Sequence, residues 1–257
     1  MSSAPLDVYI RRARGTPEAH IFDRSSHVQT PTLIRGQVNR VLTYRGAFNP
    51  PHQGHKDTLC HGFFRGGADL NLIAAILFFL DDRDVIGKYE ETNDGVKSYV
   101  LTKDERIGLF NHGGMHGGWH WCHPGGIREY WDFLRQLRFE AGRDGFEIRF
   151  ITLCGLDHVD IKPDALQRRG MTIVAGTGDP ERAKIRTENE AGFRKLRGFG
   201  DWQVQKPSET FIQQLGSEGS PEWLEQKLSM LAPGQTKNLP TDRKCTDILH
   251  STIANHS

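Results

Sequence analysis

The chain has 257 residues, and 33 Lys plus Arg stand against 32 Asp plus Glu, so the formal net charge is +1. This balance argues against a general nucleic-acid coat and against a polybasic membrane binder, although it leaves room for a local anion site. Hydrophobic residues make up 37% and charged residues 25%, which is ordinary for a globular protein. The length suits one large α/β domain or two small ones.

The cysteines and the apolar runs exclude two further classes. Four widely spaced cysteines without a CxxC pair do not form a disulfide scaffold (Cys60, Cys122, Cys154 and Cys245). The first residues do not have the basic and apolar pattern of a secretory signal. The longest apolar run, residues 70–80, is far shorter than the ~20 residues that span a bilayer. We therefore expect a cytoplasmic or nuclear protein that is neither secreted nor bound to a membrane.

The N-terminal part of the chain mixes arginines with proline and serine. Because residues 1–39 show no clear period, we expect an N-terminal extension that either packs on the surface or stays mobile. We expect order to begin near Arg40 and assign residues 40–257 to one domain. Residues 41–44 are β-prone and predict a strand that Gly46 ends.

Helical and extended patterns then alternate along the chain. A helix is expected from about residue 52 to 64, ended by two glycines, and residues 72–80 predict a buried strand. Thr102 with Glu105 three residues later predicts a helix start. Residues 127–141 predict an amphipathic helix.

Two more strands are predicted at residues 146–153 and 171–175. Strands separated by helices indicate βαβ units and a parallel sheet, so the fold class is α/β. In such sheets ligands bind beyond the carboxyl ends of the strands, near the point where the strand order reverses. The loops after Tyr44, Leu153 and Ala175 are therefore the first places to look for a site.

The most informative segment is GAFNPPHQGH, from Gly46 to His55, between a predicted strand and a predicted helix. Gly46 allows the backbone to approach a ligand closely. His52 and His55 are three residues apart, so both imidazoles lie on one face of a first helical turn. That turn also presents unpaired N–H groups, which bind anions. Two imidazoles there suit phosphate oxygens, although they could instead be satisfied loop donors.

This string resembles the HxGH signature of the adenylyl- and cytidylyltransferase superfamily, and it is most similar to the nicotinamide/nicotinate mononucleotide adenylyltransferases. The resemblance implies a Rossmann-like nucleotidyltransferase domain with His52 and His55 as catalytic residues. It also implies a nucleotide-binding role for residues of the loop and of the helix that follows (Gly46, Ala47, Phe48, Asn49, Gly54 and Lys56). Lys56 could alternatively lie in water.

Three weaker matches follow along the chain. Gly155 and Asp157 resemble the family's Gly-x-Asp motif after a central strand, which implies nucleotide contacts. Arg106 resembles an arginine that lies near the substrate ring, although a capped surface helix is an equal alternative. Ser251 and Thr252 fit the family's C-terminal hydroxyl segment, whereas Asn255 stands where an Arg that binds the triphosphate is expected.

A second unusual segment holds four histidines and one cysteine within residues 112–123. His and Cys are zinc ligands, but the glycines predict a loop without firm ligand spacing. We interpret it as a substrate loop in which Trp119 or Trp121 stacks on a base or a pyridine ring. The alternative is a surface loop whose tryptophans fill the core.

The resemblance implies an enzyme that transfers an adenylyl group from ATP to a mononucleotide phosphate, with release of pyrophosphate, in NAD biosynthesis. Nicotinamide or nicotinate mononucleotide is the acceptor that it favours, and Mg²⁺ is the implied cofactor. We expect ATP and a small phosphorylated acceptor as partners, and no nucleic acid. Two alternatives remain open. One is a divergent nucleotide-binding member with weak, cytidylyl or phosphopantetheine-type transfer, and the other is a metal-binding interaction protein.

Overall fold

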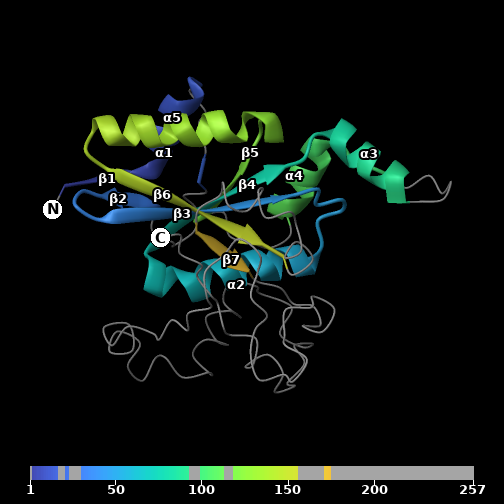
Figure 1. The fold of residues 1–257 in the computed structure, drawn as a ribbon, viewed down its shortest axis with the longest axis horizontal. Helices are drawn as coiled ribbons and strands as arrows, with labels where there is room; N and C mark the ends of the chain where they lie inside the picture. The colour runs from blue at the N-terminus through green and yellow to red at the C-terminus, as the bar shows by residue number, and fades with distance from the viewer. Residues whose placement is uncertain are drawn as a thin grey trace, which may run out of the picture.

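A five-stranded parallel sheet with helices on both faces forms the centre of the molecule (Figure 1). The computed structural model describes residues 2–16, 21–22, 30–92, 99–112, 118–155 and 171–174. The strand order is β5-β4-β3-β6-β7. The strands are β3 (Val38–Gly46), β4 (Leu72–Phe79), β5 (His120–His123), β6 (Glu147–Cys154) and β7 (Thr172–Val174). The predicted α/β class with a parallel sheet is confirmed.

The sheet separates two hydrophobic cores, because successive side chains of a strand point to opposite faces. In β4, Ala74, Ile76 and Phe78 belong to one core, while Ala75, Leu77 and Phe79 belong to the other. All six are fully buried, which explains why the strand is apolar at every position. The predicted strand at residues 72–80 is thus confirmed.

The first core lies under α1 (Leu6–Arg14) and α5 (Tyr130–Arg143), which cover the same face of the sheet in Figure 1. A short 3-10 helix, η1 (Ile127–Glu129), leads into α5. The buried side of α5 carries Tyr130, Leu134, Leu137 and Ala141, at helical spacing. The predicted helix is confirmed, but the two aromatic residues Trp131 and Phe139 are 49% and 58% exposed.

The second core lies under α2 (Gln53–Leu70), which covers the opposite face of the sheet (Figure 1), and α4 (Lys103–His112) also contributes to it. The expectation that two glycines end α2 is wrong, because the helix continues to Leu70. A glycine inside a helix costs about 1 kcal/mol, which is less than the gain from burying one large side chain. The predicted start of α4 is confirmed: the Glu105 backbone N–H donates to Thr102 Oγ1 at 3.3 Å, and the Thr102 N–H donates to Glu105 Oε2 at 2.8 Å.

The expectation that order begins near Arg40 is wrong. β1 (Ser3–Pro5) pairs antiparallel with β2 (Thr32–Ile34), and α1 follows β1 directly. Leu6, Ile10 and Leu33 are fully buried in the first core. The sequence conceals this helix because it is only nine residues long and three arginines occupy its last turn.

The expectation of a loop through residues 112–123 is wrong at its C-terminal end. His120–His123 forms β5, which pairs in parallel with β4 at the edge of the sheet. All four residues of β5 are buried. The predicted strands at 146–153 and 171–175 correspond to β6 and β7 of the sheet.

Candidate functional site

The segment GAFNPPHQGH lies where the strand order of the sheet reverses. β3 is the central strand, with β4 on one side and β6 on the other, and all three run in the same direction. The chain goes from β3 outward to β4 and β5, and then returns to β6 beside β3. Such a reversal leaves a crevice beyond the carboxyl ends of the two central strands, where ligands bind in open α/β sheets. Gly46 is the last residue of β3, so the segment begins at this crevice.

The rings of the two histidines lie close together at the start of α2, where His52 directly precedes the helix and His55 lies in its first turn. Their ring centroids are 3.7 Å apart with an interplanar angle of 32°. The backbone N–H of His52 donates to Nδ1 of His55 at 3.3 Å. Because Nδ1 accepts, a neutral His55 carries its proton on Nε2, which is then a donor. The carbonyl of His52 accepts from the N–H of His55 at 3.0 Å and begins the helix. Two imidazoles and a helix N-terminus are therefore brought together, as predicted.

Phe48 anchors the loop in the second core. Its ring is 2% exposed and meets the rings of Tyr44, Phe79 and Phe110 edge to face at 4.9 to 5.7 Å. The ring of His55 meets it at 5.1 Å and 88°. Phe48 has φ 47°, a left-handed conformation that is uncommon for a bulky residue. The loop holds this conformation because the buried ring and its aromatic neighbours fix it.

Gly46 makes room for that ring. A Cβ atom at Gly46 would lie 2.8 Å from both Cε1 and Cζ of Phe48, closer than carbon atoms approach without overlap. The structure therefore gives this glycine a packing role. A close approach of its backbone to a ligand stays a prediction.

Arg106 lies inside the molecule, and its guanidinium is bonded to protein atoms. It is fully buried, and it donates to the carbonyl oxygens of Ala47 and Leu80 and to Oδ1 of Asp82 at 2.6, 2.8 and 2.7 Å. The expected contact with a substrate ring is not what this geometry provides. Asn49 likewise bonds to protein atoms, since its side chain accepts from the Leu101 N–H at 2.8 Å.

Lys56 is buried next to His55. It is 7% exposed, and its Nζ lies 5.8 Å from the centroid of the Phe110 ring. Among the described residues, its ammonium has no hydrogen bond and no ion pair. Burial lowers the pKa of Lys56, with a smaller opposing effect from Cys60. Of the two interpretations of this lysine, exposure to water is wrong, and the phosphate contact stays a prediction.

Both tryptophans of the histidine-rich segment are buried on opposite faces of the sheet. Trp119 is 5% exposed and stacks on Phe63 at 4.3 Å and 21°. Trp121 is 7% exposed and belongs to the first core, where Arg14 lies 5.7 Å from its ring. The alternative that these tryptophans fill the core therefore describes the structure, and a stacked base would have to displace protein side chains.

The remaining predicted residues are placed only in part. Gly54 lies in the first turn of α2, and Gly155 directly follows β6, whose residue Leu153 pairs with Tyr44 of β3. Asp157, Ser251 and Thr252 lie outside the described residues, as does the C-terminal position of Asn255.

Two residues that hold the loop were missed as site residues. Asp82, in the first turn of α3 (Asp82–Thr92), accepts from Arg106, and the hydroxyl of Tyr89 donates to the carbonyl of Asn49 at 2.8 Å. Asp82 could have been suspected because it follows β4, the neighbour of β3, at the same edge of the sheet. For Tyr89, no local sequence pattern indicates its contact.

The described residues do not provide a metal-ligand cluster. No three of their His, Cys, Asp or Glu side chains are grouped so as to hold a metal ion. The carboxylates nearest the crevice are paired with cations: Asp82 with Arg106 at 2.7 Å and Asp81 with Lys103 at 3.8 Å. Burial raises the pKa of Cys122 to about 12, so this thiol of the histidine-rich segment stays protonated. These groups therefore do not fit a protein-held Mg²⁺ or zinc ion.

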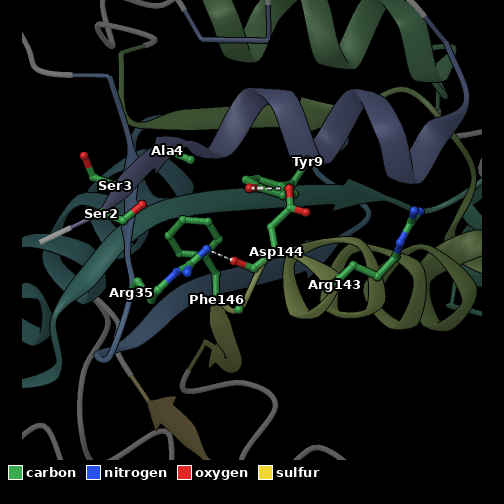
Figure 2. A pocket seen from close by; sticks show the side chains of 9 residues that line it. Ser2, Ser3, Ala4, Tyr9, Arg35, Arg143, Asp144 and Phe146 are labelled. Carbon is green, nitrogen blue, oxygen red and sulfur yellow. Dashed lines mark hydrogen bonds between the residues drawn. The ribbon is translucent and has the colours of Figure 1, made fainter.

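A cavity of about 550 Å³ lies at the opposite edge of the sheet, beside the amino ends of β3 and β6. Figure 2 shows Tyr9 and Arg35 directed at Asp144 within it. The Tyr9 hydroxyl donates to Asp144 Oδ2 at 3.0 Å, and Arg143 pairs with Glu140 at 3.3 Å. Because these polar groups bond to one another, they join α1 to the end of α5, and we do not assign the site to this cavity.

Comparison of the chain with protein-family models and with curated proteins found no match. Within the part of the chain that the structure describes, no helix is both long and apolar enough to cross a membrane.

Proposed function

We propose that this protein is a nucleotidyltransferase that transfers an adenylyl group from ATP to the phosphate of a small acceptor. Nicotinamide or nicotinate mononucleotide is the first candidate for that acceptor. One observation carries the proposal: the rings of His52 and His55, whose centroids are 3.7 Å apart, lie together at the start of α2, where the strand order reverses. This is where an open α/β sheet binds ligands, and the residues there are suited to phosphate.

The proposed step exchanges one phosphorus–oxygen bond for another. An oxygen of the acceptor phosphate attacks the α-phosphorus of ATP, and the bond between the α-phosphorus and the bridging oxygen breaks. The electron pair of that bond leaves with pyrophosphate, so no covalent enzyme intermediate forms. His52 and His55 donate to the oxygens on which charge accumulates, and Lys56, the residue after His55 in α2, contributes a positive charge.

Positioning supplies much of the rate in such a reaction, because both reactants must lie in line. The ring contact between Phe48 and His55 and the hydrogen bond from the His52 N–H to His55 Nδ1 hold the two imidazoles in place before ATP binds. Mg²⁺ is part of this proposal as the counter-ion of the triphosphate, since such ions are bound largely through substrate phosphates and water. No step is assigned to it here, because the described carboxylates beside the crevice are paired with Lys103 and Arg106.

The test is a pyrophosphate-release screen of the full chain. ATP and CTP are each combined with nicotinamide mononucleotide, nicotinate mononucleotide, phosphopantetheine or an alcohol phosphate. Pyrophosphate release with ATP and a pyridine mononucleotide is the expected result. Release with CTP alone, or with phosphopantetheine alone, would support the other branches of the superfamily. Binding of ATP without release in any combination would indicate the divergent nucleotide-binding member.

The histidines are tested in the same assay. We expect His55→Ala to lower turnover by about two orders of magnitude, the effect of losing one donor to a developing oxyanion. His61→Ala is the matched control, because His61 is an exposed histidine of the same helix, further from its N-terminus. Turnover of His55→Ala equal to that of His61→Ala would contradict the proposed role of the histidine pair.

A further inference from the structure

Arg106 connects three separate segments of the chain at the carboxyl edge of the sheet. Its Nε donates to the carbonyl of Leu101 at 3.1 Å, and Nη1 donates to the carbonyl of Ala47 at 2.6 Å. Its Nη2 donates both to the carbonyl of Leu80 at 2.8 Å and to Oδ1 of Asp82 at 2.7 Å. Ala47 follows β3, Leu80 follows β4, and Leu101 precedes α4. One side chain therefore fixes the loops after both strands.

Asn49 makes a second connection between the same segments. Its Oδ1 accepts from the Leu101 N–H at 2.8 Å, and its Nδ2 donates to the Tyr99 carbonyl at 3.2 Å. Its own carbonyl accepts from the Tyr89 hydroxyl of α3. The loop that leads to His52 is thus held at Ala47 by Arg106. It is held at Asn49 by Tyr89 of α3 and by the residues that directly precede α4.

We propose that Arg106 is a positioning residue for His52 and His55 and does not contact substrate. This inference rests on the proposed function for its kinetic consequences, but its structural content can be tested without any activity. The guanidinium is fully buried and four of its N–H groups bond to protein atoms, so it presents little to a ligand. What it controls is the path of the backbone from β3 to the first turn of α2.

The chemistry explains why arginine stands at this position. The guanidinium holds five N–H donors in a rigid plane and stays charged, so it can bond to carbonyl groups that lie in different directions. A lysine ammonium is a single point with three donors on a flexible stem. It cannot reach Leu101, Ala47 and Leu80 from one place, so Arg106→Lys is not a conservative change here.

The structural test compares the histidine resonances of two variants. In ¹H–¹³C NMR spectra, the Cε1–H signals of His52 and His55 are assigned with His52→Gln and His55→Gln. We expect Arg106→Gln to displace or broaden both signals. Leu137→Ala is the matched control, because it opens the first core, on the far face of the sheet, and lowers stability without touching the loop. Unchanged signals in a folded Arg106→Gln protein would overturn the proposal.

If Arg106→Gln does not fold, Asn49→Ser and Asp82→Ala replace it, since each removes only part of the same network. The same two histidine signals decide: displaced signals support the positioning role, and unchanged signals in both variants overturn it.

The kinetic test separates positioning from substrate contact. We expect Arg106→Gln to lower kcat on the order of 100-fold, the effect of a small misplacement of reacting groups, while the KM for ATP and for the acceptor stays within about threefold. A raised KM with unchanged kcat would overturn the proposal, because it would indicate a substrate contact. If the unmodified protein releases no pyrophosphate with any acceptor, the proposed function fails, and the NMR comparison still decides the role of Arg106.

Discussion

Acidification should destabilise this protein through one buried histidine, His123. The residue is 1% exposed at the end of β5, where its ring stacks on Phe78 at 5.0 Å and meets Phe133 edge to face at 4.6 Å. Its Nδ1 has no hydrogen-bond partner among the described residues. Burial lowers the pKa of His123 to about 4, and the positive charges of Arg14 and Lys103 act in the same direction. A backbone contact with Gly125 and the charge of Glu129 oppose this shift only in part.

The pH range and the magnitude follow from linkage. Between the ordinary pKa of about 6.5 and the folded pKa of about 4, the unfolded chain binds a proton at His123 that the folded protein does not bind. The stabilisation is therefore complete above pH 6.5 and is lost as the pH falls toward 4. At 1.36 kcal/mol for each pH unit, the loss from this one residue is about 3 kcal/mol.

The assay is urea unfolding at several pH values between 7.5 and 4, with the free energy of unfolding obtained by linear extrapolation. His123→Leu removes the titrating ring, so its free energy of unfolding should fall with acid by about 3 kcal/mol less than that of the unmodified protein. Carboxylates such as Asp144, whose pKa is lowered mainly by the hydrogen bond from Arg12, cancel in this comparison. Parallel profiles for His123→Leu and the unmodified protein would refute the reasoning.

Two further predictions concern the local geometry of the site region. Gly46→Ala should lower the free energy of unfolding by about 1 to 3 kcal/mol, because the new methyl group overlaps the Phe48 ring, whereas Gly108→Ala, which meets no atom within 4 Å on α4, should be neutral or stabilising. Equal effects of the two substitutions would contradict this account. Thr102→Ala should cost about 1 kcal/mol by removing the cap of α4, and Thr102→Ser should restore most of it; urea unfolding measures both, and no loss in Thr102→Ala would show that the cap is not needed.

The parts of the fold that depend on local sequence were predictable. The apolar run of β4 predicts a strand because burial on both faces leaves few positions for polar side chains. The alternation at the start of β6 predicts one because Ile148 is buried between the exposed Glu147 and Arg149. The capping of α4 by Thr102 and Glu105 was predictable because both partners lie within one turn of the helix. The place of His52 and His55 also followed from the order of strand, loop and helix.

The parts that depend on contacts between distant segments were not predictable. Arg106 bonds to Ala47 across 59 residues and to Leu80 across 26, and nothing in its own neighbourhood indicates that it is buried. Trp119 follows two glycines, which suggested a loop that includes Trp121, yet Trp121 lies in β5 and the two rings are buried in different cores. Tertiary packing overrides local propensity in both cases.

Trp119, which directly precedes β5, and Trp121, which lies within it, place a tryptophan in each core. Trp119 stacks on Phe63 of α2, so its emission senses any movement of the helix at whose start the histidine pair lies. Trp121 lies in the other core with Arg14 of α1 over its ring, so its emission senses the docking of the N-terminal helix. With Trp119 and Trp121 replaced in turn by phenylalanine, the change in fluorescence would distinguish movement of α2 from loosening of the opposite face of the sheet.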